Sequence, residues 1–324
     1  MNSPKNKKTI DLYDNDCLFW QNDGKEYMLL IHQDDCPDNP IEDLTGESDL
    51  VKQVLWGGYS LGHTALRKGA DDPNTFWQYA LNKYLTEQEF QTLIKDGRLP
   101  GVKIEPVPDS NLVNVCAATR TTSVFCEATE DNEVLLEGVN LNHISLLDEL
   151  SNMLSINACT ELLKDMLFVL PVWVYEHSGM TVSCGKREYP YNDRFDSGLL
   201  GYAYCLKSDI EESWPEETKK DPDAWKTLAE TAITADIKTL DQYLNNDIYW
   251  YELKSRPIGD TKSVTTKDDW EDIDSCGGFY GTDILESGLC EAVAYGLKEA
   301  IDTNAYRTGK AKSQQITVYT YVED

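Results

Sequence analysis

Segments with the patterns of strands and helices follow one another along this chain without the regular strand–helix–strand spacing of a doubly wound fold. Continuous apolar runs predict buried strands over 26–32 and 166–175. Between residues 111 and 137, short alternating segments are typical of an antiparallel meander. We therefore predict an α+β fold in which antiparallel or mixed sheets pack against helices, not a doubly wound sheet.

Three helices have distinct signals. Apolar residues at every third or fourth position predict a long helix over 223–245. Thr86 and Glu89 form a capping-box pattern, which predicts the start of another helix. We also predict a last helix over 282–301, followed by an alternating strand over 315–322.

The chain has 324 residues, a length that suits one large domain or two medium ones. Three prolines between residues 98 and 112 predict an extended connection. We divide the chain into an acidic N-terminal αβ region over 1–110, a β-meander with a helix over 111–165, and a C-terminal α+β domain over 166–324. The second and third of these segments could form one continuous domain.

The net charge of the chain is −28, from 57 acidic and 29 basic residues. Most of the acidity falls in four blocks, residues 11–50, 127–149, 209–252 and 265–291, whose net charges are −11, −7, −8 and −7. An evenly acidic surface would suit solubility or salt adaptation, whereas blocks favour defined acidic surfaces. A surface of this sign repels nucleic acids and anionic membranes and attracts basic proteins.

Carboxylates can imitate the phosphates of DNA, which carries one charge per about 1.7 Å of helix axis. Residues three or four apart on a helix, or alternate residues on a strand, place carboxylates about 5–7 Å apart. The candidate partner-binding residues are Asp209, Glu212 and Glu216 if that segment is helical, and Asp268, Asp269, Glu271, Asp272 and Asp274 on either kind of element. For each segment taken alone, the alternative is an ordinary solvated face.

A second group of polar residues indicates a possible pocket formed by the loops at 176–198 and 274–281. It comprises Glu176, His177, Ser178, Asp193, Asp196, Ser197 and Cys276. Cys276 or Cys184 could act as a nucleophile with His177 as its base, and Asp193 or Asp196 could orient the imidazole. The spacing matches no known catalytic motif, so we predict no catalytic residue and leave open whether the protein is an enzyme.

Neither a metal nor a cofactor is predicted. The nine cysteines contain no C-x-x-C pair, and the spacing of Asp34, Asp35 and Asp38 is not that of an EF-hand. The glycines match neither a dinucleotide-binding motif nor a P-loop. No apolar run reaches membrane length and no secretion signal is evident, so we expect a protein of the reducing cytosol.

Several blocks resemble an uncharacterised family of bacteriophage and prophage proteins, namely YEHSGMTVS, FDSGLLGYAY and DSCGGFYGTDILESG. The family has Y-x-H-S-G-x-T, W-D-S-G-x-x-G and D-S-x-x-G-F-Y-G motifs. This chain departs from it at Phe195, which replaces the tryptophan, and has extra residues around 64–165. The resemblance implies a phage protein in the cytoplasm of a bacterial host and transfers no activity.

By analogy, an acidic phage protein is similar to the DNA-mimic inhibitors of restriction or CRISPR enzymes. Our first hypothesis is such an inhibitor, whose partner is a basic nucleic-acid-binding protein, with no direct binding to nucleic acid or membrane. The second hypothesis is an enzyme or small-ligand-binding protein that uses the two loops. The third is an acidic structural or regulatory phage protein with no role against host defence.

Overall fold

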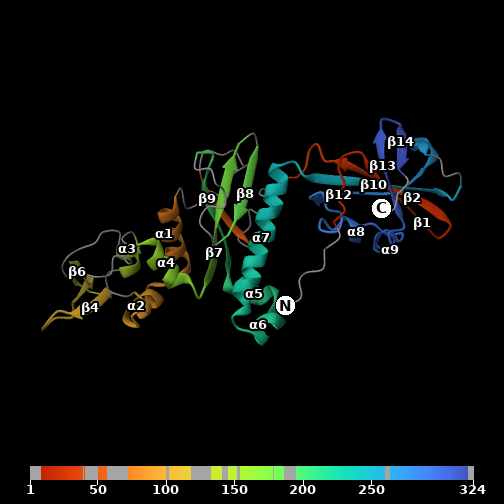
Figure 1. The fold of residues 1–324 in the computed structure, drawn as a ribbon. Coiled ribbons are helices and arrows are strands. Elements are labelled where there is room, and N and C mark those ends of the chain that lie inside the picture. The colour runs from red at the N-terminus through yellow and green to blue at the C-terminus, as the bar shows by residue number, and fades with distance from the viewer. Residues whose placement is uncertain are drawn as a thin grey trace, which may run out of the picture. The chain divides into compact units, whose positions relative to one another are not determined.

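The computed structural model describes residues 9–38, 40, 50–56, 72–99, 102–117, 133–140, 145–151, 154–177, 179–185, 195–259 and 263–319 (Figure 1). The chain divides into two compact units. Unit 1 comprises residues 1–40, 179–181 and 239–324, and unit 2 comprises residues 41–178 and 182–238. Both units combine helices with antiparallel sheets, which confirms the predicted α+β class.

These units differ from the three consecutive segments expected from the sequence. Unit 1 joins the N-terminal strands to the C-terminal ones, because β1 (Asp16–Asn22) pairs with β13 (Tyr306–Lys312) and β2 (Lys25–Gln33) pairs with β10 (Ile248–Pro257). Unit 2 is built from the middle of the chain. Composition along the sequence cannot reveal such pairing, since it depends on contacts between residues more than 200 positions apart.

Unit 1 contains a seven-stranded sheet in the order β11-β14-β13-β1-β2-β10-β12. The remaining elements of this unit are β11 (Val264–Thr266), the short 3₁₀ helix η2 (Lys267–Asp269), β12 (Glu271–Tyr280), α8 (Leu289–Ala292), α9 (Leu297–Asp302) and β14 (Gln315–Tyr319). Strand β12 lies at one edge of this sheet, and in the described part of the chain it pairs only with β10.

A two-residue turn joins β1 to β2. Asn22 pairs with Lys25, and the residues between them, Asp23 and Gly24, have φ values of 48° and 75°. Positive φ at both positions is the geometry of the type I′ turn that Asp-Gly favours, because its twist matches that of the two strands. The local sequence therefore determines this hairpin.

Both faces of the unit 1 sheet are apolar near its centre, because the strand residues alternate between two clusters. One face carries Leu18, Leu29 and Leu253 and packs with residues of α8 and α9 such as Leu289 and Leu297. The other face carries Phe19, Met28, Leu30, Trp270, Ile316 and Val318. Burial on both faces explains why residues 26–32 have a continuous apolar sequence and not an alternating one.

Unit 2 contains a three-stranded sheet in the order β4-β5-β6 and most of a four-stranded sheet in the order β3-β9-β7-β8, whose strand β8 begins in unit 1. Its strands are β3 (Lys52–Leu55), β4 (Val102–Pro106), β5 (Val113–Ala117), β6 (Glu133–Val139), β7 (Leu167–Glu176), β8 (Met180–Cys184) and β9 (Ser197–Leu206). Its helices are α1 (Pro73–Tyr84), α2 (Glu87–Lys95), α3 (Leu146–Ser151), α4 (Ile156–Leu163), α5 (Lys207–Ser213), α6 (Pro215–Lys220) and α7 (Ala224–Leu244), the last of which ends in unit 1.

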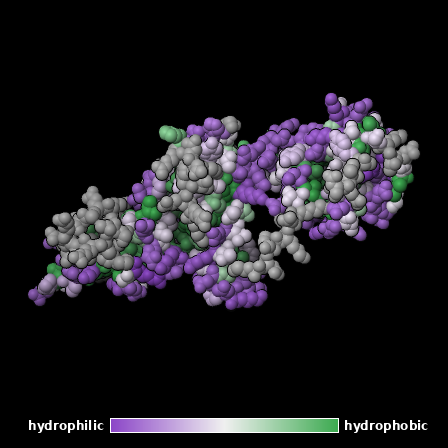
Figure 2. Space-filling model, viewed as in Figure 1, coloured by the Kyte–Doolittle hydropathy of each residue, from purple (hydrophilic) through white to green (hydrophobic). Residues whose placement is uncertain are grey.

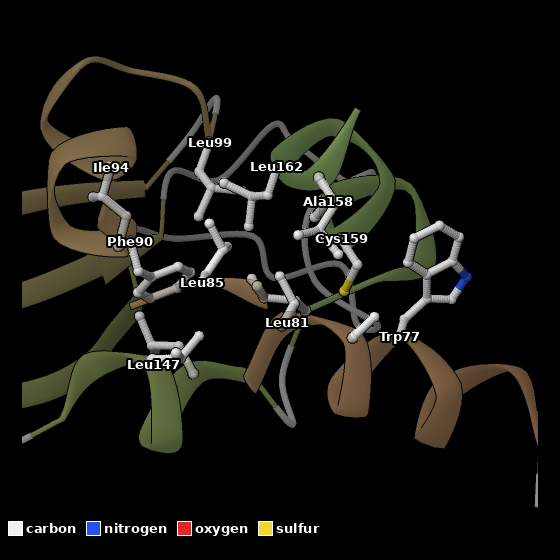
Figure 3. Packing of buried hydrophobic residues seen from close by; sticks show 14 of the residues in the cluster. Trp77, Leu81, Leu85, Phe90, Ile94, Leu99, Leu147, Ala158, Cys159 and Leu162 are labelled. Carbon is white, nitrogen blue, oxygen red and sulfur yellow. The ribbon is translucent and has the colours of Figure 1, made fainter. Parts of the chain in front are cut away.

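Helices α1 to α4 form the main core of unit 2. Phe90 of α2, Leu147 of α3 and Leu162 of α4 belong to the same buried cluster as Leu81 of α1 (Figure 3). The start of α2 is fixed by the predicted capping box, in which Thr86 accepts a hydrogen bond from the backbone N–H of Glu89 and donates its own N–H to the Glu89 carboxylate.

Two expectations about the C-terminal part of the chain are wrong. The predicted helix over 282–301 is only two short helices, α8 and α9, because Gly288 and Gly296 adopt φ values of 79° and 82° and start each of them. The segment 274–281, expected as a loop, is mostly the second half of β12. The predicted long helix is confirmed as α7.

Candidate functional site

The acidic residues at 268–274 lie in unit 1 on η2 and β12. Asp268 and Asp269 belong to η2, and Glu271, Asp272 and Asp274 belong to β12. All five residues are exposed. Because β12 is an edge strand, its carboxylates stand on a rigid sheet but remain open to a partner. Figure 2 shows that hydrophilic residues cover most of the coloured surface.

Three of these carboxylates are held by hydrogen bonds or an ion pair within unit 1. Asp269 Oδ2 accepts hydrogen bonds from the backbone N–H of Thr266 (2.8 Å) and from Thr265 Oγ1 (2.9 Å). Asp274 Oδ2 accepts a hydrogen bond from the hydroxyl of Tyr251 (3.1 Å). Asp272 forms an ion pair with Lys254, although its side chain is 80% exposed. These contacts fix where the charges lie and still leave Asp272 and Asp274 at the surface.

The acidic segment is anchored through a buried charge network. Glu26, which is 2% exposed, accepts hydrogen bonds from Arg256 and Arg307, with 2.8 Å between its Oε2 and Arg256 Nε. The guanidinium of Arg256 also stacks on Trp270 at 4.1 Å and donates to Thr265 Oγ1 (3.1 Å). Thr265 donates in turn to Asp269. The network therefore connects β2, β10 and β13, which carry Glu26, Arg256 and Arg307, to η2.

A groove of about 500 Å³ lies beside β12 on the same unit. Its walls are formed by Trp250, Glu252 and Lys254 of β10 and by Asp272, Ile273, Asp274 and Ser275 of β12. Burial lowers the pKa of Lys254, but the hydrogen bonds to Asp272 and Glu252 outweigh it and raise the pKa overall, so this ammonium stays charged. The groove therefore combines an aromatic wall with charges of both signs.

His32 supports the wall of this groove. Its ring stacks on Trp250, with 4.2 Å between the ring centroids, and its Nε2 lies 3.6 Å from Glu252 Oε1. Burial lowers the pKa of His32 more than the nearby Glu252 raises it, so the imidazole is neutral at pH 7. No local pattern singles out His32, because its partners Trp250 and Glu252 follow more than 200 positions later.

The other acidic candidates, Asp209, Glu212 and Glu216, lie on α5 and α6 of unit 2. Asp209 forms an ion pair of 2.6 Å with Lys52, which links α5 to β3. Glu216 faces Lys219 at 3.2 Å on the same helix. Lys207, Lys219 and Lys220 also lie on these helices, which is typical of a solvated, salt-bridged face and reduces the local negative charge.

The structure brings together only part of the predicted alternative pocket. His177 Nδ1 lies 2.9 Å from Asp196 Oδ2, and both side chains are exposed. Glu176 ends β7 and Ser197 begins β9, beside this pair. Ser178 and Asp193 lie outside the described residues. Cys276 lies on β12 in unit 1, whereas His177 belongs to unit 2.

Cys184 is a poor candidate for a nucleophile. Burial raises the pKa of its thiol, so little thiolate is present at neutral pH. Its Sγ lies 4.0 Å from Thr234 Oγ1 of α7. What the described residues offer at this place is an exposed imidazole oriented by a carboxylate, an arrangement that can move a proton.

In the described ranges, no group of three His, Cys, Asp or Glu side chains is arranged to hold a metal ion. None of the helices in those ranges is long and apolar enough to cross a membrane. Asp34, considered above as a calcium ligand, accepts a hydrogen bond from the backbone N–H of Cys36 and so stabilises a turn.

Sequence reasoning missed the residues that line the groove on β10. Strand β10 extends through Lys254 and Arg256 to Pro257, although these residues are polar. The signal was nevertheless present, since Glu252, Lys254 and Arg256 alternate with buried residues and so share one face of the strand.

Comparison of the chain with models of protein families, with curated proteins and with solved structures found no match in any of the three.

Proposed function

We propose that this chain is an acidic binding protein that occupies the nucleic-acid-binding surface of a basic partner. The resemblance to phage proteins favours a bacterial defence nuclease, of the restriction or CRISPR type, as that partner. The chain would then act in the cytoplasm of the host as an inhibitor and would bind neither nucleic acid nor membrane directly.

One observation carries the proposal: exposed carboxylates follow one another on η2 and β12 and stand on a rigid sheet edge. A protein surface that imitates DNA must present several negative charges at fixed positions, because flexible charges lose conformational entropy when they bind. The hydrogen bonds of Asp269 and Asp274 supply such fixation. The cluster on α5 and α6 fits this role less well, since lysines lie among its acids.

The proposal is tested by DNA cleavage assays with a panel of purified restriction and CRISPR nucleases. We expect the chain to inhibit at least one of them and excess duplex DNA to relieve the inhibition. The affinity should fall steeply as salt rises from about 0.05 to 0.5 M, because electrostatic attraction between exposed groups is screened. An affinity for the nuclease that does not change with salt would contradict the proposal.

Matched charge variants locate the surface. The triple variant Asp268→Asn, Glu271→Gln and Asp274→Asn removes three charges from the β12 segment and should weaken inhibition at least tenfold. The control variant Glu211→Gln, Glu212→Gln and Glu216→Gln removes three charges from α5 and α6 and should change it less than twofold. If the variant on α5 and α6 weakened inhibition more than the variant on the β12 segment, the binding surface would lie on unit 2.

A further inference from the structure

Strand β12 is an unusually open sheet edge. Seven of its ten residues are exposed, and within the described chain it pairs on one side only, with β10. An edge strand of this kind presents backbone N–H and C=O groups that lack a partner strand, and another extended segment can pair with them. The opposite edge of the sheet, β11, has only three residues and offers much less of this surface.

The charge of β12 selects what can pair with it. Glu271, Asp272 and Asp274 are acidic, and the strand contains no basic residue. Like charges placed opposite each other across two strands are unfavourable, so a second copy of β12 aligned parallel to the first is repelled. The same charges favour a strand that carries lysine or arginine. The acidic edge therefore favours an added segment of opposite charge.

The groove beside β12 fits one side chain of such a strand. Alternate residues of an added strand would point over the sheet face that carries Trp250 and Glu252. An arginine reaching this groove would meet the indole of Trp250 and the carboxylate of Asp272, and a planar guanidinium suits both stacking and pairing with a carboxylate. Oε2 of Glu252, in the same wall, lies 3.2 Å from Lys254 Nζ and adds a further negative charge to the groove.

The glycines of β12 add room at this place. Gly277 lies so close to Trp250 that a Cβ at position 277 would come within 3.2 Å of the tryptophan Cβ, and Gly278 has a φ of 81°. The register of β10 and β12 shifts between Tyr249 and Tyr251, next to these glycines. Because Gly277 and Gly278 have no side chains, β12 presents only backbone where it passes Trp250.

We propose that the open edge of β12 binds an extended, arginine-containing segment of the partner as an additional strand, and that one arginine of that segment enters the groove lined by Trp250, Asp272 and Asp274. This inference rests on the function proposed above and specifies the partner: it supplies a flexible basic segment, and the complex depends on backbone hydrogen bonds as well as on charge.

The test uses the full chain and two synthetic peptides. The first is a twelve-residue peptide of alternating arginine and threonine, which favours an extended conformation. The second has the same sequence and is N-methylated at every internal residue, so it keeps the charge but cannot donate backbone hydrogen bonds. We expect the first peptide to bind and the second to bind at least tenfold more weakly in calorimetric titrations at one salt concentration.

Hydrogen exchange locates the bound peptide. The first peptide should slow exchange of the β12 amides, and the variant carrying Glu271→Gln and Asp274→Asn should bind it at least tenfold more weakly. The control, Glu299→Gln with Asp302→Asn on α9, removes the same charge from unit 1 and should change binding less than twofold.

The possible outcomes separate this inference from the function on which it rests. Equal binding of both peptides, or no protection of β12, would overturn strand addition while leaving an acidic surface that attracts basic proteins. If the first peptide does not bind, strand addition is wrong even if a nuclease is inhibited. If no nuclease is inhibited but the first peptide protects β12, strand addition stands and the inhibitor function does not.

Discussion

At the scale of single residues, Glu26 has the most demanding environment in unit 1. It is almost completely buried between Arg256 and Arg307, which come from strands on either side of it in the sheet. A buried charge is tolerated only when it is paired and hydrogen-bonded, because the protein interior solvates it poorly. Here one carboxylate satisfies two guanidinium groups.

We therefore expect Glu26→Gln to destabilise the protein by about 3–5 kcal/mol, since it leaves both arginines without their counter-charge. Urea unfolding measures the change, and hydrogen exchange of β2 shows whether it is confined to unit 1. The exposed Asp302→Asn on α9 is the control and should stay within about 0.5 kcal/mol of the parent. A loss below about 1 kcal/mol for Glu26→Gln would contradict the assigned role of the network.

At the scale of elements, the paired strands β3 and β9 approach closely at a glycine, which has no side chain. Gly201 of β9 lies against β3, and a Cβ at this position would be 2.1 Å from the carbonyl oxygen of Val54 and 2.7 Å from Leu55 Cα. Both neighbours are backbone atoms of the paired strand. Glycine is required here because a backbone ladder cannot give way as a flexible side chain can.

Gly201→Ala should accordingly separate β3 from β9 and cost unit 2 at least about 1–3 kcal/mol. Gly198→Ala lies three residues earlier on the same strand, where nothing approaches within 4 Å, and serves as the matched control. Thermal unfolding of both variants gives the comparison. Equal midpoints would show that β3 does not pack against β9 at Gly201.

At the scale of the whole molecule, the net charge of −28 opposes compaction. The Debye length is about 30 Å at 0.01 M salt and about 3 Å at 1 M, so the repulsion between acidic surfaces extends across a unit only at low salt. Stability should therefore depend strongly on ionic strength.

We expect the melting temperature to rise as sodium chloride increases from about 0.01 to 0.5 M. The triple variant Asp268→Asn, Glu271→Gln and Asp274→Asn should show a smaller rise, because part of the repulsion is already removed. Differential scanning calorimetry measures both series. A melting temperature that falls or stays constant over this range would mean that attractive ion pairs outweigh the repulsion.

Local sequence patterns are sufficient to predict the type of many elements and the sign of the surface charge. The apolar period of α7, the capping box at Thr86 and the continuous apolar run of β2 are local patterns, and each element forms where its pattern predicts it. Other local signals are Asp23-Gly24, which forms the turn of the first hairpin, and Gly288 and Gly296, which start α8 and α9.

Which strands pair, and therefore where the candidate site lies, depends on contacts between distant parts of the chain. The pairing of β2 with β10 puts His32 against Trp250, and the pairing of β10 with β12 leaves β12 at the edge of the sheet. The two predicted acidic clusters belong to different units. Periodicity states which face of an element is buried, but many partners can bury that face equally well. The choice among them depends on close packing and buried charge pairs between distant residues, such as Glu26 with Arg256, which no local pattern contains.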